Sequence, residues 1–219
     1  MISVVIRTRN EVGNLVVCLK KLAEQNEEHE VIVVDSYSDD DTERICQEQG
    51  CRVVQCKRFT YGRALNQGIE AAEGDKICIL SGHCFPKDKN FLRYLKKPFS
   101  FQDNIVGVYA KQSPHRNTNL LEYRNFLYIY RNEKIIQDNC PFFNNAASMI
   151  KKDIWKEIKF DEEVKAQEDM IWAREILRRG YRIVYEPRAE VVHLHEDSIE
   201  NTVRRYIKEA EVMKEMGFR

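Results

Sequence analysis

Three short apolar runs in the first half of the chain each end in residues that could bind a ligand. The runs and their polar ends are 2–6 with Thr8, Arg9, Asn10 and Glu11, 31–34 with Asp35, and 76–80 with Ser81 and His83. If the runs are parallel strands, their carboxyl ends meet at one sheet edge, where open α/β proteins bind ligands. A histidine there could contact a metal ion or a phosphate. Each feature alone is weak, because acidic loops usually cap helices.

The elements that must position these residues alternate between strand and helix. Apolar runs predict strands and apolar spacing predicts helices; the strands are 2–6, 31–34, 52–56 and 76–80, and the helices are 15–22, 42–49 and 63–72. This alternation predicts a parallel sheet with right-handed crossovers. The first strand is not followed by G-x-G-x-x-G, and G-x-x-x-x-G-K-[ST] does not occur in the sequence. Both absences argue against a dinucleotide fingerprint and a P-loop.

The second half of the chain has a less regular pattern. It predicts strands at 106–110, 182–185 and 189–193, helices at 120–130, 153–158, 170–179 and 198–216, and a loop at 135–143. Small residues at 144–150 would let a backbone approach a ligand closely. Two alternatives stay open for the aromatic-rich helix: its apolar side chains are core, or they line an acceptor groove. These side chains are Leu121, Phe126, Tyr128 and Tyr130.

Composition narrows the class of protein. The 219 residues carry 35 Lys and Arg against 35 Asp and Glu, a formal net charge of +0, which argues against broad nucleic-acid binding. We find no apolar run approaching the ~20 residues of a membrane-spanning helix and no signal peptide, so we expect a cytoplasmic protein. The 7 cysteines form no C-x-x-C pair, and we expect reduced, partly buried thiols.

Several stretches, in this order, resemble the landmarks of family-two inverting glycosyltransferases with the GT-A fold. They are 3–11, 33–42, 62–75, 81–83, Asn145-Ala146-Ala147, Glu168-Asp169 and His193-Leu194-His195. The resemblance covers roughly residues 2–195, and the Leu80-Ser81-Gly82-His83-Cys84-x-Pro86 form is similar to bacterial cell-surface polysaccharide and rhamnosyltransferase-like members. It implies an α/β nucleotide-diphospho-sugar transferase fold with a mostly parallel central sheet flanked by helices.

The resemblance also implies an organisation. The glycosyltransferase domain would be 1–196, with a nucleotide-binding half at 1–86 and an acceptor and catalytic half at 87–196. Residues 197–219 would form a C-terminal amphipathic helix, which could dock on the core, on a partner or on a membrane. Of these, we favour the core.

Residue by residue, the resemblance implies roles at the strand ends. The loop that meets the nucleotide base and ribose in the family is matched by Thr8, Arg9, Asn10 and Glu11. Asp35 matches the aspartate that accepts a hydrogen bond from a pyrimidine N–H, and Asp40 matches a second acidic position in the same loop. Arg63 lies in a segment that approaches the diphosphate. Asp169, beside Glu168, matches the catalytic base; we expect the helix dipole to keep it ionised, although such a residue can simply cap a helix.

One motif departs from the family pattern. Ser81 and His83 stand where the family has an Asp-x-Asp metal motif. His83 with His193 or His195 could still hold a divalent cation, Mn²⁺ somewhat better than Mg²⁺. Stabilisation of the leaving group by Arg63 without a metal is the alternative.

The implied reaction is single displacement, which inverts the anomeric configuration. The implied partners are a UDP- or dTDP-sugar and a glycan or lipid-linked acceptor, with peripheral association at the inner membrane face and no nucleic acid. Two rivals are a catalytically silent nucleotide-sugar-binding module and a sugar-nucleotide pyrophosphorylase. The second would need a Gly-rich phosphate loop, and residues 7–13 lack one.

Overall fold

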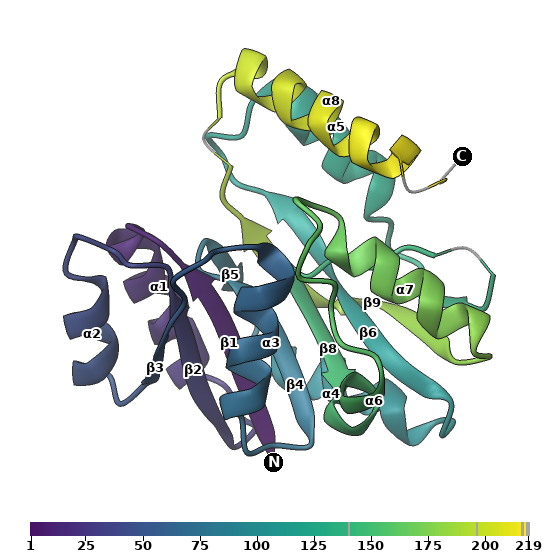
Figure 1. Cartoon of the computed structure of the whole chain (residues 1–219), viewed down its shortest axis with the longest axis horizontal. Helices are drawn as coiled ribbons and strands as arrows, with labels where there is room; N and C mark the ends of the chain where they lie inside the picture. Colours follow the sequence, from purple (N-terminus) through teal and green to yellow (C-terminus); the bar gives the residue numbers. More distant parts are fainter. Residues whose placement is uncertain (140, 196, 216, 218–219) are drawn as a thin grey trace.

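The computed structural model describes residues 1–139, 141–195, 197–215 and 217, and it has the predicted α/β architecture (Figure 1). The strands are β1 Ile2–Thr8, β2 His29–Asp35, β3 Arg52–Gln55, β4 Lys76–Ser81, β5 Cys84–Pro86, β6 Ile105–Pro114, β7 Ile135–Gln137, β8 Ala147–Lys151 and β9 Arg182–His193. The helices are α1 Val12–Ala23, α2 Thr42–Glu48, α3 Tyr61–Ala71, α4 Phe91–Lys96, α5 Leu120–Ile129, α6 Lys152–Glu157, α7 Glu168–Arg178 and α8 Ile199–Glu215, with a 3₁₀ turn η1 at Lys97–Ser100.

The described strands form one mixed sheet in the order β3-β2-β1-β4-β8-β6-β9-β5, with β7 also paired to β9. Strands β1 to β4 run parallel to one another, whereas β8 is antiparallel to both β4 and β6. The chain moves outward from β1 to β3 and then returns to place β4 on the other side of β1. This reversal puts the carboxyl ends of β1 and β4 at the position where open α/β sheets bind ligands.

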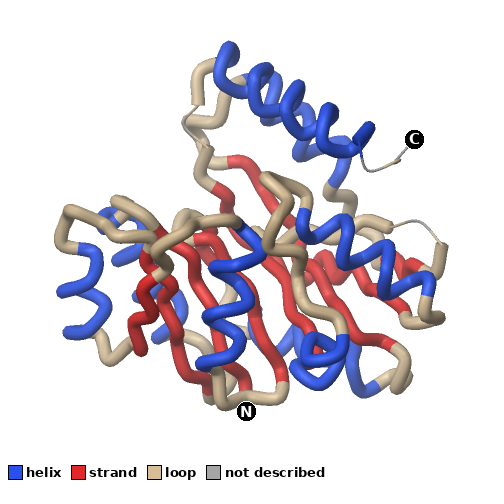
Figure 2. Tube along the Cα trace, viewed as in Figure 1, coloured by secondary structure: helices blue, strands red, loops and turns tan. Residues whose placement is uncertain are grey.

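Helices cover both faces of the sheet, as Figure 2 shows. Along β1 the apolar side chains alternate: Val5 packs with α3, α6 and α7 on one face, and Val4 and Ile6 pack with α1 and α4 on the other. This period-2 burial on both faces explains why the early strands are continuous apolar runs instead of an apolar–polar alternation.

The structure differs from the predicted elements in three places. The predicted loop at 135–143 contains β7, a strand of 3 residues. Strand β5, which is not among the predicted strands, follows the turn at Gly82 and His83 and pairs with β9. The two predicted late strands form the single strand β9, which keeps its pairing with β6 through a register shift opposite Ala110 and Lys111. That irregularity accommodates Pro187, which has no N–H to donate to a ladder.

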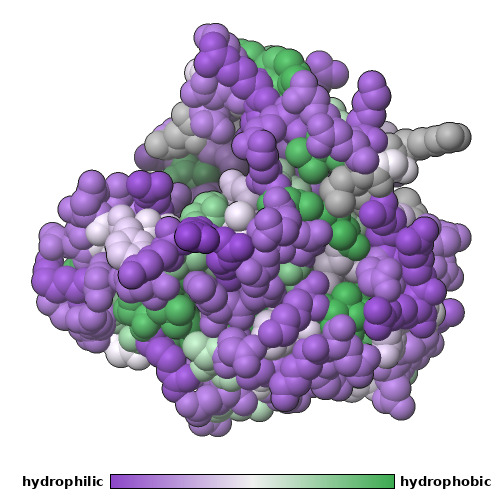
Figure 3. Space-filling view, viewed as in Figure 1, coloured by the Kyte–Doolittle hydropathy of each residue, from purple (hydrophilic) through white to green (hydrophobic). Residues whose placement is uncertain are grey.

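Helices α5 and α8 pack together beyond the carboxyl ends of β6 and β9, away from the body of the sheet (Figure 1). Asn119 joins them by donating to Thr202 Oγ1 at 2.8 Å. The side chains named for α5 divide: Phe126 and Tyr130 are buried, whereas Leu121 and Tyr128 are exposed. An acceptor groove along this helix stays a prediction. Figure 3 shows a hydrophobic patch over the upper end of this helix pair. Among the described residues, no helix combines the length and the apolar character needed to cross a bilayer.

The described cysteines are free thiols. Cys18, Cys46, Cys56, Cys78 and Cys84 are buried and Cys51 is half-buried, whereas Cys140 lies outside the described residues. Burial, with a smaller contribution from Cys51, raises the pKa of the Cys46 thiol to about 12. These thiols therefore act as core side chains.

Gly62 is required by the close approach of α3 to the segment before α7. A Cβ at Gly62 would lie 2.0 Å from the carbonyl oxygen of Asp161. We expect Gly62→Ala to lower the free energy of unfolding by about 1–3 kcal/mol, because the backbone around Asp161 must move. Thermal denaturation checks this, with Gly13→Ala in α1 as the control, since a Cβ there meets nothing within 4 Å. Equal melting temperatures for the two variants would contradict the argument.

Candidate active site

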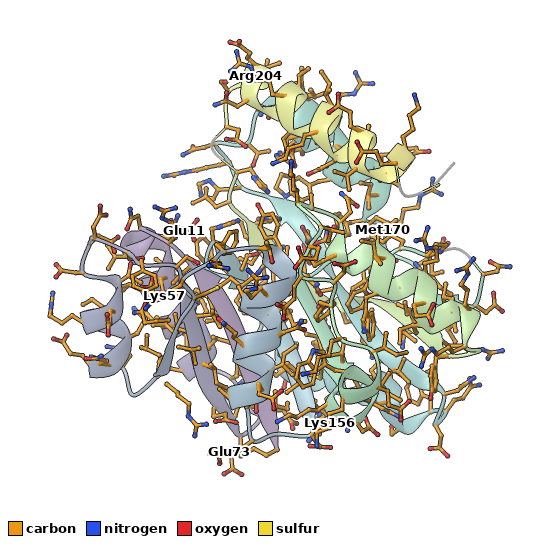
Figure 4. All side chains as sticks on the ribbon, viewed as in Figure 1. Glu11, Lys57, Glu73, Lys156, Met170 and Arg204 are labelled. Carbon is orange, nitrogen blue, oxygen red and sulfur yellow. The ribbon has the colours of Figure 1, made fainter. Side chains whose placement is uncertain are left out.

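A cleft of about 450 Å³ opens at the carboxyl ends of the strands, beneath α5 and α8. Its walls come from the end of β1, the loop before β8, the start of α7, the end of β9, and the inner faces of α5 and α8. Asn144, Asn145 and Ala146 line it, so the small-residue stretch predicted to approach a ligand does border the cleft. Figure 4 labels Glu11 and Met170 on opposite sides of the region below α8.

Glu168 and Asp169 form the first turn of α7 and face the cleft. The helix begins after Gln167, whose φ of 64° turns the chain sharply. Asp169 Oδ2 accepts a hydrogen bond from the Asn145 N–H at 3.1 Å, and Glu168 Oε1 lies 3.5 Å from Asn145 Nδ2. The loop before β8 thus fixes both carboxylates at the rim of the cleft.

The expectation that the helix dipole keeps Asp169 fully ionised was wrong. Burial, followed by the adjacent Glu168 carboxylate, raises the pKa of Asp169 to about 7. Its hydrogen bonds from Asn145 and Met170 and the charge of Arg7 oppose this rise but do not cancel it. A carboxyl group with such a pKa can take a proton near neutral pH, as a general base must.

Arg7 is a cation beside these carboxylates, and no role in the site was predicted for it from the sequence. Its Nη1 lies 3.8 Å from Glu168 Oε1, and its guanidinium carbon lies 4.8 Å above the ring of Tyr61. Both Nε and Nη1 are buried without a hydrogen-bond partner among the described residues. The sequence offered one signal for Arg7, its position next to the polar residues that end the first strand. Its contact with Glu168 joins two distant parts of the sequence and could not be predicted from it.

Three histidines form a cluster, two of which, His193 and His195, line the cleft. Each of His83, His193 and His195 offers a ligand atom, and these atoms lie within 4.8 Å of one another. The pairing of Cys84 with His193 across β5 and β9, and the hydrogen bond from the Leu194 N–H to the His83 carbonyl at 3.0 Å, explain why residues so distant in sequence converge.

Two of these histidines, His193 and His195, have the protonation state that metal binding needs. Burial, followed by the Arg205 guanidinium, lowers the pKa of His195 to about 4. Burial, followed by the other imidazoles, lowers the pKa of His193 well below its usual value. His193 Nε2 is also buried without a hydrogen-bond partner among the described residues. Neutral imidazoles with a free lone pair fit a divalent cation.

The predicted nucleotide-binding residues lie beside this cleft, at the ends of β1, β2 and β4. Asn10 and the loop after β2 interlock: Asn10 Oδ1 accepts from the Asp39 N–H at 2.9 Å, and the Asn10 N–H donates to Ser38 Oγ at 2.8 Å. Asp35 is 1% exposed and accepts from the Ser38 N–H at 3.1 Å. Asp40 accepts from the Val12 N–H at 3.2 Å and so fixes the start of α1.

The remaining predicted residues lie either at the strand ends or next to the histidine cluster. Thr8 pairs with Asp35 in the sheet, and its hydroxyl is buried without a partner among the described residues. Ser81 is buried beside Arg7 in the β1–β4 register, and Arg9 is exposed. Glu11 contacts His83 and thereby connects the loop after β1 to the histidines.

Arg63 lies apart from the cleft. Its Nε donates to Glu162 Oε2 at 2.9 Å and its Nη1 donates to the Arg58 carbonyl at 3.1 Å. It therefore ties α3 to the segment that leads into α7.

Helix α8, which the sequence set apart as a C-terminal addition, forms one wall of the cleft. Glu122 of α5 is 4% exposed and accepts hydrogen bonds from Arg205 Nη2 at 2.8 Å and from the Tyr206 hydroxyl at 2.6 Å. All three line the cleft. Ile199, Val203 and Ile207 of α8 are exposed on its outer side. Docking on the core is therefore only partial.

The model of glycosyl transferase family 2 matches residues 3–159, more than half of the chain. The chain belongs to this family. Curated relatives of this chain include the O-antigen chain rhamnosyltransferases WbaN of Salmonella anatum and RfbN of Salmonella typhimurium. They are 25% and 24% identical to this chain in alignments 194 residues long, which cover 83% and 80% of this chain. The chain spans about three fifths of the length of these relatives, 61% and 60%.

Solved structures share the fold. The mannosyltransferase PcManGT from Pyrobaculum calidifontis, in complex with GDP-Man and Mn²⁺, superposes with a TM-score of 0.70 at 21% identity, covering 88% of this chain and 56% of that one. S. aureus TarS 1-349 in complex with UDP-GlcNAc gives 0.71 at 18% identity, covering 90% and 59%. The GT-A type α/β fold predicted from the sequence is confirmed.

Proposed function

We propose that this family 2 chain is an inverting glycosyltransferase, which moves a sugar from a nucleotide-diphosphate donor to a hydroxyl of a glycan or lipid-linked acceptor. One observation carries the proposal: a cleft at the strand ends is lined both by Asp169, a carboxyl group with a pKa near neutrality, and by His193 and His195, which cluster with His83. The first suits a proton acceptor, and the second suits the charge of a leaving diphosphate.

The donor nucleotide would lie along the ends of β1, β2 and β4. Asp35 would accept a hydrogen bond from a pyrimidine N–H, so UDP- and dTDP-sugars are the proposed donors. Because the curated relatives are rhamnosyltransferases, a deoxyhexose is the first sugar to test. The acceptor would enter beneath α5 and α8, whose exposed apolar side chains would rest on a membrane that carries a lipid-linked acceptor.

Asp169 would act as the general base. Its carboxylate takes the proton of the acceptor hydroxyl while the hydroxyl oxygen forms a bond to the anomeric carbon, on the face opposite the diphosphate. The bond between the anomeric carbon and the diphosphate oxygen breaks, and its electron pair leaves with the diphosphate. His83, His193 and His195 would hold a divalent cation, which when bound offsets the negative charge of the diphosphate. The charge of Arg7 would limit the rise of the Asp169 pKa.

Nucleotide binding gives the first test of this function. We expect UDP or dTDP, at about 100 times its Kd, to raise the melting temperature by about 5–10 °C, since a ligand that binds only the folded state stabilises it. Asp35→Asn should reduce the shift, whereas Asp103→Asn, an exposed position at the opposite end of β6, should retain it. Differential scanning fluorimetry measures this, and no shift with any nucleotide would contradict the proposal.

A donor screen tests the reaction itself. Mass spectrometry would follow the release of nucleotide diphosphate from a set of UDP- and dTDP-sugars in the presence of candidate acceptors. Release that depends on the acceptor and on one donor identifies the activity.

A further inference from the structure

Each of the clustered histidines has an oxygen atom near its Nδ1. His83 Nδ1 lies 3.2 Å from Glu11 Oε1, and His193 Nδ1 lies 2.7 Å from Gln112 Oε1. His195 Nδ1 lies 3.8 Å from Asp197 Oδ2. An imidazole whose Nδ1–H donates to such an oxygen keeps its lone pair on Nε2.

The two closest oxygens occupy fixed positions. Gln112 is 2% exposed on β6, and β6 pairs with β9 next to His193. Glu11 immediately precedes α1, and its carboxylate packs against the Gly82 turn, where an added Cβ would lie 3.1 Å from Glu11 Oε2. The sheet and the turn therefore fix the orientations of two imidazoles independently.

The Nε2 atom of His193, which has no hydrogen-bond partner among the described residues, indicates where a ligand would bind in this cluster. His193 is 6% exposed, and the described residues supply no hydrogen-bond partner for its Nε2. A buried imidazole nitrogen without a partner is costly unless something else bonds to it. Its ring centroid lies 4.1 Å from that of His195 and 5.1 Å from that of His83. The free lone pair therefore lies within a set of other nitrogen donors.

We propose that His83, His193 and His195 form an all-imidazole site that selects Zn²⁺ and Co²⁺ over Mn²⁺ and excludes Mg²⁺, with Glu11 and Gln112 as the positioning residues of two of its ligands. This rests on the proposed function, because the diphosphate of the donor would complete the coordination. This proposal replaces the expectation that the site binds Mn²⁺ or Mg²⁺. It also assigns Glu11 to the positioning of His83 instead of to contact with the nucleotide.

The selectivity follows from the donor atoms. Mg²⁺ requires oxygen ligands in near-octahedral geometry and gives up water reluctantly. Imidazole suits later first-row metals, whose affinities rise from Mn²⁺ through Co²⁺, with Zn²⁺ above Mn²⁺. The metal-compatible cluster found among the described residues contains histidines and no carboxylate. The nearest carboxylate, Glu11, contacts the Nδ1 side of His83.

Calorimetric titration of the chelator-treated 219-residue chain with metal alone tests the proposal. We expect Zn²⁺ and Co²⁺ to bind with 1:1 stoichiometry, Mn²⁺ to bind more weakly, and Mg²⁺ to give no binding heat. The visible spectrum of the Co²⁺ form should lack a thiolate charge-transfer band, which separates the histidine site from the free cysteines. His83→Ala should abolish the site, whereas His29→Ala, at the start of β2, should leave it unchanged.

The positioning role has its own variants. Glu11→Gln and Gln112→Leu should each weaken Zn²⁺ binding by about 10–100-fold, the usual cost of losing a hydrogen-bond partner of a metal-bound histidine. Gln112→Glu, which keeps an acceptor oxygen beside His193 Nδ1, should restore most of the affinity. Full affinity in both weakened variants would overturn the positioning role, and Mg²⁺ binding as tight as that of Zn²⁺ would overturn the selectivity.

The result that would overturn the proposed function differs from the result that would overturn the metal site. Specific Zn²⁺ binding without any glycosyl transfer under any metal would leave the site standing and overturn the transferase. Transfer that continues in chelator, by a chain that binds no metal, would leave the transferase standing and overturn the site.

Discussion

Replacement of Asp169 by asparagine is expected to lower kcat by about 10²–10⁴-fold, the usual contribution of a general base. The amide has nearly the shape of the carboxyl group, and its oxygen can still accept the hydrogen bond from the Asn145 N–H. It cannot take a proton. Steady-state assays of transfer, together with calorimetric binding of the donor, would measure the effect, and donor affinity should barely change.

The control for this variant is Asp103→Asn. Asp103 is exposed before the start of β6, far from the cleft at the other end of that strand, so its kcat should match that of the native chain. The melting temperature of Asp169→Asn should not fall, because the change removes a like-charge contact with Glu168. Near-native turnover in Asp169→Asn would reject the assignment of the base.

Replacement of Arg7 by methionine is expected to change the pH dependence of the reaction. The base works when deprotonated, so the rate should rise with pH through the pKa of Asp169, about 7. The charge of Arg7 lowers that pKa, so its removal should move the rising limb to higher pH. At pH 6 kcat should fall roughly 10–100-fold, and part of the loss should be recovered at pH 9.

Two further variants separate charge from packing at this position. Arg7→Lys keeps a cation and should hold the pH profile close to that of the native chain, although it loses part of the stacking on Tyr61. Arg44→Met, on the exposed face of α2, should change nothing. A reduced kcat with an unmoved pH profile in Arg7→Met would show that Arg7 only supports the fold.

The fold was largely predictable because its first half is built from signals that are local in sequence. Runs such as 31–34 and 76–80 are too apolar and too short for anything but buried strands, and their alternation with amphipathic helices leaves few topologies. Strands β5 and β7 were missed for the opposite reason. Each has 3 residues and forms only because it pairs with β9. In sequence, β9 lies about a hundred residues from β5 and about fifty residues from β7.

The residues of the candidate site could be predicted from the sequence, but their burial and their neighbours in space could not. The strand-end residues and the histidines could be named from motifs. The pKa of Asp169 could not, because it depends on burial and on how Arg7 and Glu168 are placed around it. Gln112 had no signal in the sequence: it belongs to an ordinary strand, and only the pairing of β6 with β9 brings it to His193.

The position of α8 has a consequence for how such enzymes diversify. The helix contributes a wall to the cleft, yet among its described residues only Thr202 is buried. Under the proposed function, substitutions at Arg205, Tyr206 or Met213 would therefore reshape the acceptor entrance without altering the strand ends proposed to hold the nucleotide. Recognition of the two substrates would then be encoded in separable parts of the gene, and new glycan linkages would arise by exchanging this wall while the donor half is inherited intact.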